Sequence, residues 1–210
     1  MPNGTERSNH GVTPRSMMEQ AELRYRISNR GREPAWRRAD GALRRRVPAA
    51  LRSWLIDTAS LTERLRGIFG GSFRVNLRGQ RWERPGFSER AVLGMADHRV
   101  ALIREVHLQC AGSSVVFART IMPAEALCGS GRRLARLGER PLGAMLFANR
   151  SIVRGDLEIA RVEPGCDIYA TAAGATTGQG LWGRRSIFLV GGQPILVNEI
   201  FLPAILREAP

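Results

Sequence analysis

Two charged residues, Arg104 and Glu199, each stand in a row of apolar residues along an expected β-strand. Side chains alternate between the two faces of a strand, so every second residue shares a face. The apolar residues on the face of Arg104 are Leu102, Val106 and Leu108, and those on the face of Glu199 are Ile195, Val197 and Phe201. A guanidinium keeps its proton when it is buried and therefore needs an anion. Arg104 is accordingly a candidate for binding a negatively charged group.

The pattern leaves three interpretations of this pair open. In the first, Arg104 and Glu199 bind each other as a structural salt bridge. In the second, both line one cavity and contact different ends of a polar ligand. In the third, one of them lies on the exposed face of its strand. The other face of the Arg104 strand has polar residues that we expect to face solvent, namely Glu105, His107 and Gln109.

Two predicted helix starts offer backbone donors to such a cavity. Ser60, with Glu63 three residues later, forms a capping box, so a helix is expected to begin at Leu61. Pro141 favours a second helix start, at Leu142. The first-turn N–H groups of a helix lack intrahelical partners and lie at the positive end of its dipole, which suits a carboxylate. Every helix has such a start, so the pattern alone favours both leucines as core residues.

Three further arginines have positions that the pattern does not settle. Arg119 shares a face with apolar residues such as Phe117, and is either a buried arginine that faces the same cavity or an edge arginine in water. Arg184 and Arg185 follow a Trp-Gly pair. A phosphate-binding patch is one interpretation of these two, but a solvated turn that leads into a strand is favoured.

The overall charge favours anionic partners without identifying one. The chain has 210 residues, and 32 basic against 19 acidic residues give a formal net charge of +13 at pH 7. All 32 are arginine, a bias that a GC-rich genome would produce. The first 50 residues hold 11 arginines and 5 acidic residues, so much of the excess lies at the N-terminal end. Such a charge attracts nucleic acid, phosphate or small carboxylates.

Several classes of chemistry lack their sequence signatures. There is no G-x-G-x-x-G after a strand, no G-x-x-x-x-G-K-[ST], no G-x-S-x-G and no metal-ligand spacing of histidines. The 3 cysteines have no C-x-x-C spacing, which is typical of reduced thiols in a reducing compartment. The sequence lacks a signal peptide and an apolar run of the roughly 20 residues that a membrane-spanning helix needs. We therefore expect a cytoplasmic protein that uses no metal and no cofactor.

The apolar periodicity predicts helices first and then strands in hairpins, which is an α+β fold with an antiparallel sheet. Residues 1–30 are expected to form a basic, flexible arm, and residues 31–210 the folded domain. The expected helices span 47–56, 61–69, 123–137 and 141–147. The expected strands span 73–80, 89–95, 100–110, 115–122, 157–162, 185–190 and 195–202. Residues 163–180 are expected to be a mobile loop.

Several short segments, taken together, indicate a protein family more specifically than any single one of them does. They are Ser60-Leu61-Thr62, Leu102-Ile103-Arg104-Glu105-Val106, Ala118-Arg119-Thr120 with Met122-Pro123, Leu137-Gly138, Pro141-Leu142-Gly143 with Leu146-Phe147, Leu157-Glu158-Ile159-Ala160-Arg161, Leu181-Trp182-Gly183-Arg184-Arg185-Ser186, and Glu199-Ile200-Phe201-Leu202-Pro203. Together they cover about residues 50–205. In this order and at close to this spacing, they resemble the chorismate–pyruvate lyases of ubiquinone biosynthesis.

The resemblance implies a cofactor-independent lyase that converts chorismate to 4-hydroxybenzoate and pyruvate. It implies a single antiparallel sheet with helices folded over it, enclosing a small ligand cavity. It also implies that Arg104 binds the ring carboxylate with the backbone N–H groups of Leu61 and Leu142, and that Glu199 meets the oxygen at the far end of the ring. Arg119 is expected to contact the enolpyruvyl carboxylate or to line its path. Arg104, Glu199, Leu61 and Leu142 are also the residues that the strand and helix patterns marked as candidates. This agreement favours the interpretation in which Arg104 and Glu199 line one cavity.

The chain also departs from the family pattern, and two other functions are alternatives. Position 61 is Leu in place of Met, and both the 163–180 loop and the N-terminal arm are longer than expected. A ligand-sensing domain of GntR-type regulators has a similar fold and catalyses nothing, but residues 1–50 are too short and irregular for its winged helix-turn-helix. Nucleic-acid binding lacks a recognised motif, and only 6% of residues are aromatic. We expect a monomer with no nucleic-acid partner and no stable membrane insertion.

Overall fold

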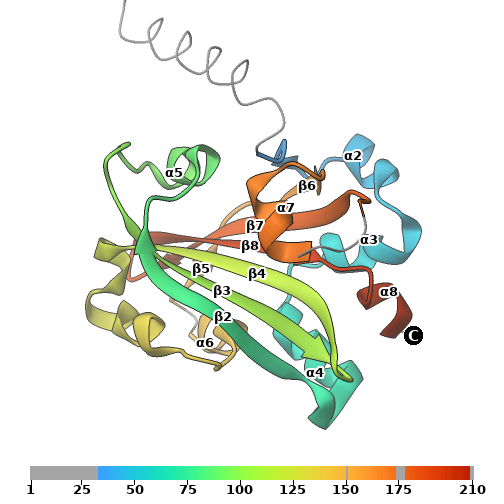
Figure 1. The fold of residues 1–210 in the computed structure, drawn as a ribbon. Coiled ribbons are helices and arrows are strands. Elements are labelled where there is room, and N and C mark those ends of the chain that lie inside the picture. The colour runs from blue at the N-terminus through green and yellow to red at the C-terminus, as the bar shows by residue number, and fades with distance from the viewer. Residues whose placement is uncertain (1–32, 150, 174–177, 209–210) are drawn as a thin grey trace, which may run out of the picture.

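The fold is one eight-stranded antiparallel sheet with helices on both faces (Figure 1). The computed structural model describes residues 33–149, 151–173 and 178–208, and the predicted basic arm, residues 1–30, lies outside them. The strands follow the order β1-β6-β7-β8-β4-β3-β2, and β5 also pairs with β7. This arrangement is the predicted α+β class with a single antiparallel sheet.

Strands β2, β3, β4, β7 and β8 each have nine residues or more, whereas β1 and β5 have two residues each. The strands are β1 (Arg37–Arg38), β2 (Arg74–Glu83), β3 (Ala101–Cys110), β4 (Ser113–Pro123), β5 (Val153–Arg154), β6 (Glu158–Val162), β7 (Leu181–Val190) and β8 (Gln193–Phe201). The helices are α2 (Gly41–Arg46), α3 (Ala49–Leu55), α4 (Leu61–Phe69), α5 (Phe87–Leu93), α6 (Leu142–Ala148), α7 (Asp167–Ala173) and α8 (Ile205–Glu208). Short 3₁₀ helices are η1 (Gly70–Ser72), η2 (Ala124–Leu127) and η3 (Gly129–Arg136). Within the described ranges, no helix has the length and apolar character to cross a membrane.

Two tight hairpins bring the central strands together. Ala111 and Gly112, with φ of 49° and 84°, join β3 to β4, and Gly191 and Gly192, with φ of 58° and 79°, join β7 to β8. Two-residue loops with positive φ at both positions match the right-handed twist of the strands they join. Strand β8 also pairs with β4, so the two hairpins meet at the centre of the sheet.

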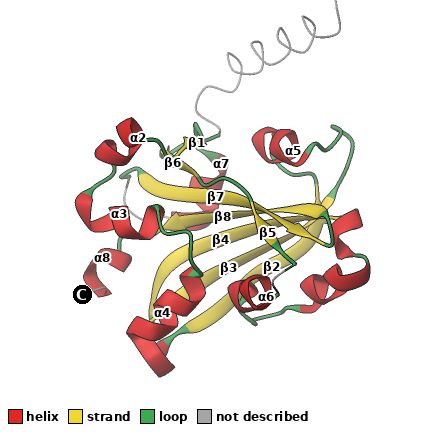
Figure 2. Ribbon diagram, turned by 180° about the vertical axis from the view of Figure 1, so that it is seen from behind, coloured by secondary structure: helices red, strands yellow, loops and turns green. Residues whose placement is uncertain are grey.

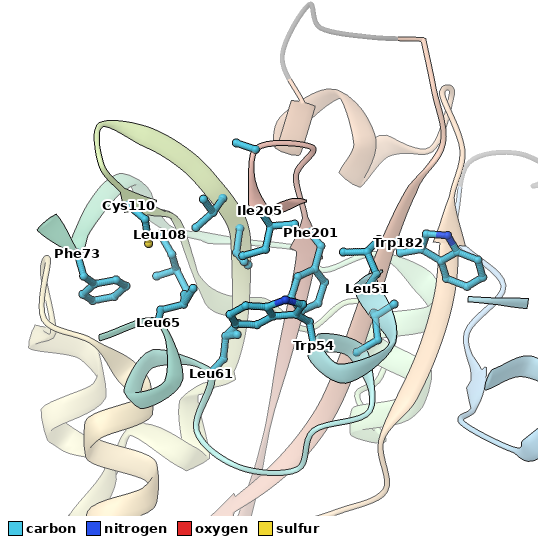
Figure 3. Packing of buried hydrophobic residues seen from close by; sticks show 14 of the residues in the cluster. Leu51, Trp54, Leu61, Leu65, Phe73, Leu108, Cys110, Trp182, Phe201 and Ile205 are labelled. Carbon is cyan, nitrogen blue, oxygen red and sulfur yellow. The ribbon is translucent and has the colours of Figure 1, made fainter. Parts of the chain in front are cut away.

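Helices α3, α4 and α6 cover one face of the sheet (Figure 2). Leu51 and Trp54 of α3 and Leu61 and Leu65 of α4 belong to one apolar cluster with Phe201 of β8 (Figure 3). A second cluster beneath α6 includes Leu142, Leu146, Phe188, Val190, Ile195 and Val197. Helices α5 and α7 cover the opposite face, where Tyr169, Phe117 and Ile200 form one cluster and Leu93, Ile103 and Ile121 another.

The prediction of a strand over 89–95 is wrong, because most of these residues lie in helix α5. Ala91, Leu93 and Met95 do alternate as in a strand, but local hydrogen bonds favour a helix. The Glu89 carboxylate accepts a hydrogen bond from the backbone N–H of Gly86 at 2.9 Å, as in a capping box. Gly94, with φ of 65°, then ends the helix in the left-handed conformation that glycine adopts readily.

The prediction of a mobile loop over 163–180 is wrong for residues 167–173, which form helix α7. The helix is anchored by Tyr169, which is 6% exposed and donates a hydrogen bond to the carbonyl of Gln179 at 3.0 Å. Alanine is the best helix former, and three of the seven residues from 167 to 173 are alanine. Tyr169 packs on the sheet as part of an apolar cluster. Residues 174–177 of the predicted loop lie outside the described part of the chain.

Candidate functional site

A small cavity of about 50 Å³ lies between the sheet and the first turns of α4 and α6. Its walls include four residues predicted for the site, Arg104, Glu199, Leu61 and Leu142. Most of the other lining residues are apolar, so the few polar groups lie in surroundings that hold little water. A cavity this small fits a small ligand and excludes an extended polymer.

The two predicted helix starts meet at this cavity. Helix α4 begins at Leu61, and the Ser60 hydroxyl before it accepts a first-turn backbone N–H at 3.3 Å. Helix α6 begins at Leu142. Gly143 permits the two helix starts to approach closely, since a Cβ at this position would lie 2.8 Å from the hydroxyl oxygen of Thr62. The two starts therefore form adjacent parts of one wall.

Arg104 points into the cavity from β3 and is 2% exposed. Its Nε and Nη2 groups donate to the carbonyl oxygen of Gly138 at 3.2 and 2.7 Å, and Nη2 also donates to that of Arg140 at 3.0 Å. Burial lowers the pKa of Arg104 to about 10, so the side chain is still charged at neutral pH. No carboxylate in the described part of the chain pairs with it. Arg104 is thus a buried cation held by neutral carbonyl groups, an arrangement that favours binding an anion.

Glu199 faces the same cavity from β8, but its partner is Arg184. The Nε of Arg184 lies 2.5 Å from Oε2 of Glu199. The Nη1 group of Arg184 donates to the carbonyl oxygens of Trp54 and Asp57 at 2.8 and 2.6 Å, which fixes the pair against α3 and the turn that follows it. A salt bridge between Arg104 and Glu199 is therefore the wrong interpretation. The two residues line one cavity, and their contact with a ligand stays a prediction.

The prediction of a solvated turn at Arg184 and Arg185 is wrong, because both residues already belong to β7. Arg184 is 1% exposed and Arg185 is 6% exposed. Arg184 faces the cavity, whereas Arg185 points to the opposite face. The hairpin could have predicted this placement. Its two-residue loop pairs Val190 with Gln193, and with no change of register six residues further along each strand, Arg184 pairs with Glu199.

Arg154 of β5 is a cavity residue that sequence reasoning missed. Its Nε donates to the Ser186 hydroxyl at 3.1 Å and its Nη1 to the Thr58 carbonyl at 2.6 Å. Its guanidinium carbon lies 5.4 Å from the centre of the Phe188 ring. Burial and the positive charge of Arg184 lower the pKa of Arg154. Strand β5 has only two residues, which is too short to show a period of two.

Arg119 lies outside this cavity, because it projects from the opposite face of the sheet. Its Nε lies 3.0 Å from Glu89, and its Nη1 lies 2.6 Å from Glu105 and 3.2 Å from Glu83. Burial alone would lower the pKa of Arg119, but the charges and hydrogen bonds of Glu89 and Glu105 raise it. Both predicted placements of Arg119, in the shared cavity or at an edge in water, are therefore wrong.

A β-bulge between β3 and β4 explains why Arg119 changes face. Val115 is an extra residue on β4, because the pairs on either side of it are Gln109 with Ser114 and Leu108 with Val116. Without the extra residue, the register would pair Arg104 with Arg119; with it, Arg104 pairs with Thr120. A shift of one residue moves every side chain beyond it to the other face.

The face that holds Arg119 is covered and not solvated, which overturns a further prediction. Glu105 is 3% exposed, and His107 is half-buried with its ring 5.6 Å from that of Phe117 in an edge-on arrangement. Burial and the positive charge of Arg78 lower the pKa of His107. The expectation of solvent on this face failed because its covering helices, α5 and α7, were predicted as a strand and a loop.

The cavity wall is a set of anion-binding groups with one carboxylate. Its charged residues are Arg104, Arg154, Arg184 and Glu199, so three positive charges and one negative charge leave +2. Over the described ranges, no three His, Cys, Asp or Glu side chains gather as a metal site requires. The arrangement can hold a small dianion at fixed points and can accept a hydrogen bond from one hydroxyl group.

Comparison with known proteins places the chain in a family. The family model for chorismate lyase matches residues 32–209. The chain belongs to the chorismate lyase family. A probable chorismate pyruvate-lyase of Methylococcus capsulatus is 42% identical over 156 residues, which is 74% of this chain and 96% of that protein. A protein of the same name from Aromatoleum aromaticum is 42% identical over 168 residues, which is 78% of this chain and 90% of that protein.

Solved structures share the fold of this chorismate lyase family member at much lower identity. The effector domain of PhnF from Mycobacterium smegmatis has a TM-score of 0.52 at 18% identity, covering 71% of this chain and 91% of that one. The C-terminal domain of the histidine utilization repressor from Pseudomonas syringae pv. tomato has a TM-score of 0.50 at 12% identity, covering 63% of this chain and 92% of that one. These likenesses confirm the fold that the resemblance implied.

Proposed function

We propose that the protein is a chorismate lyase that converts chorismate to 4-hydroxybenzoate and pyruvate, the step that supplies 4-hydroxybenzoate for ubiquinone biosynthesis. The observation that carries the proposal is Arg104, a buried cation held by neutral carbonyls in a cavity whose wall also contains Glu199. Family membership and relatives named probable chorismate pyruvate-lyases support the same substrate.

The site residues divide between the two ends of the substrate ring. Arg104 binds the carboxylate on C1, with the first-turn N–H groups of Leu61 and Leu142 as further donors. Glu199, held in place by Arg184 at 2.5 Å, accepts a hydrogen bond from the hydroxyl on C4. Two fixed contacts at opposite ends of a six-membered ring define its orientation, which is the main contribution that the protein makes to a unimolecular reaction.

The reaction balances without a cofactor. The bond between C3 and the ether oxygen breaks, the hydrogen on C4 leaves the ring as a proton, and the methylene carbon of the released enolpyruvate gains a proton. One dianion becomes two monoanions, 4-hydroxybenzoate and pyruvate, and the ring becomes aromatic, which supplies the driving force. The apolar cavity wall excludes water while the charged groups hold the ring in the reactive orientation.

We also infer that the protein acts as a monomer in the cytoplasm and without nucleic acid. Cys128 and Cys166 are free thiols in the part of the chain that the structure describes, which suits a reducing compartment.

The test is to mix the purified protein with chorismate and to follow the products by absorbance and chromatography. We expect equimolar 4-hydroxybenzoate and pyruvate without added metal or nucleotide. If chorismate stays intact while 4-hydroxybenzoate binds, the cavity belongs to a ligand sensor, and the lyase proposal fails. If neither compound interacts, the substrate assignment fails altogether.

A further inference from the structure

Arg154 is a second arginine at the cavity that has no carboxylate partner in the described part of the chain. Its Nε and Nη1 groups donate to neutral acceptors, the Ser186 hydroxyl at 3.1 Å and the Thr58 carbonyl at 2.6 Å. Over the same residues, its Nη2 group has no hydrogen-bond partner. The half-buried guanidinium is therefore held in one orientation while its charge is not neutralised by an ion pair.

Arg184, the other arginine near Glu199, is already engaged. It forms an ion pair with Glu199 at 2.5 Å, and its Nη1 group donates to two backbone carbonyls at 2.8 and 2.6 Å. At 1% exposure it also has little room to turn. Of the two arginines at this end of the cavity, Arg154 is the one that can offer its charge to a ligand.

The strand order places Arg154 and Arg104 on opposite sides of the cavity. Arg104 is on β3 and Arg154 is on β5, and the path between them runs through β4, β8 and β7. At about 4.8 Å for each step between neighbouring strands, their backbones are roughly 19 Å apart across the sheet. Glu199, on β8, lies between them. A ligand held by Arg104 at one end therefore extends toward Glu199 and then toward Arg154.

The charge of the cavity wall favours a second anionic group. Three arginines and one glutamate leave a net charge of +2. The ring carboxylate at Arg104 compensates one of these charges. The other remains at the end where Arg154, Arg184 and Glu199 together carry a net charge of +1. A ligand with a single carboxylate leaves that charge unmatched, whereas a dianion compensates both.

We propose that Arg154 binds the second carboxylate of the substrate, the one on the enolpyruvyl group, and that Ser186 and Thr58 orient it for this contact. The inference rests on the proposed lyase function. With the C4 hydroxyl at Glu199, the enolpyruvyl ether on the neighbouring carbon C3 begins beside Glu199, and its carboxylate extends toward Arg154. Arg154 is then the group that distinguishes the dianionic substrate from 4-hydroxybenzoate, which has only the ring carboxylate.

The decisive experiment compares substrate and product in the variant Arg154→Gln. We expect the KM for chorismate to rise roughly 10- to 100-fold, the loss typical of a charge-assisted hydrogen bond to a carboxylate. The kcat should change much less, because the contact holds substrate and transition state alike. The Kd for 4-hydroxybenzoate, measured by calorimetry, should stay within about twofold. Arg154→Lys, which keeps the charge, should recover part of the loss.

A matched control removes one positive charge from a neighbouring strand. Arg161 of β6 pairs with Glu163 and its side chain is 52% exposed, so Arg161→Gln should leave both ligands unaffected. If Arg154→Gln weakened the binding of chorismate and of 4-hydroxybenzoate by the same factor, Arg154 would only support the fold near Thr58. An unchanged KM would also overturn the proposal.

The outcomes separate this inference from the lyase proposal. If the wild-type protein does not convert chorismate, the lyase proposal fails, and the subsite is tested by equilibrium binding of intact chorismate to the wild type and to Arg154→Gln. If the wild type converts chorismate and the variant has the same KM, the lyase function stands and the subsite is refuted.

Discussion

Replacing Arg104 with Met tests whether this arginine binds the ligand or supports the fold. Burial lowers the pKa of Arg104 from its ordinary value to about 10, so the charged side chain costs the folded state about 3 kcal/mol. The substitution removes that cost, but it leaves the carbonyl groups of Gly138 and Arg140 without their donors. Each such group costs about 1–3 kcal/mol. The opposing contributions nearly cancel, and we expect the free energy of unfolding to change by less than about 2 kcal/mol.

Ligand binding should respond far more strongly than stability. A guanidinium that holds a carboxylate contributes about 1.5–3 kcal/mol for each charge-assisted hydrogen bond, and the Nη1 group of Arg104 takes no part in the three bonds to the carbonyls of Gly138 and Arg140. Loss of two such bonds should raise the Kd for 4-hydroxybenzoate at least about 100-fold. Calorimetric titration gives the Kd, and urea unfolding followed by circular dichroism gives the stability.

Arg104→Lys completes this test, because it keeps the charge but loses the planar guanidinium, whose Nε and Nη2 bind the carbonyls of Gly138 and Arg140 while Nη1 stays available for a carboxylate. We expect affinity for 4-hydroxybenzoate between that of the wild type and that of Arg104→Met. The reasoning is refuted if Arg104→Met binds 4-hydroxybenzoate within about threefold of the wild type. A loss of more than about 4 kcal/mol of stability with intact binding by the folded fraction would identify Arg104 as a structural residue.

Three further predictions address the other charged groups. Glu199→Gln should lower product formation at least about 100-fold while the chain still folds, and single-turnover assays with chorismate would contradict the assignment if they gave the wild-type rate. Arg119→Met should cost about 3–5 kcal/mol, because the buried Glu89 loses its cation while Glu83 and Glu105 keep Arg81, and the Kd for 4-hydroxybenzoate should stay unchanged. His107 has a pKa below the ordinary 6.5 because of burial and Arg78, so the folded state resists its protonation and stability falls as the pH drops below about 6.5. Thermal melts from pH 7.5 to 5 should show a smaller decrease for His107→Gln than for the wild type, and parallel curves would contradict this cause.

The sequence was most informative where a polar residue interrupts a regular pattern. Arg104 and Glu199 could be located because a period of two is visible on long strands, and a charge in an apolar row stands out. Leu61 and Leu142 could be located because capping and proline signals act within one helical turn. These local rules placed four residues on one cavity wall, although nothing local shows what lies across the cavity from each of them.

The failures have equally definite causes. Arg184 was assigned to a turn because Gly183 before it suggested a loop, although the hairpin register already pairs it with Glu199. Arg154 belongs to a two-residue strand, and its place at the cavity depends entirely on pairing with β7. Helix α5 was missed because seven residues fit both a strand and a helix, and the hydrogen bond of Glu89 to the Gly86 N–H decides between them. Pairing between distant segments is tertiary information, which local patterns do not contain.

The bulge at Val115 makes the spacing of residues as important as their identity. Arg119 follows Arg104 by fifteen positions, and because Val115 in this interval is an extra residue on β4, one arginine points to the cavity and the other to a cluster of internal carboxylates. Deleting Val115 would exchange the two faces along the rest of β4 and place Arg119 beside Arg104, whereas no substitution could have that effect. In an alignment of relatives that keep both clusters, the length of this interval should therefore be preserved even where the residues within it are not.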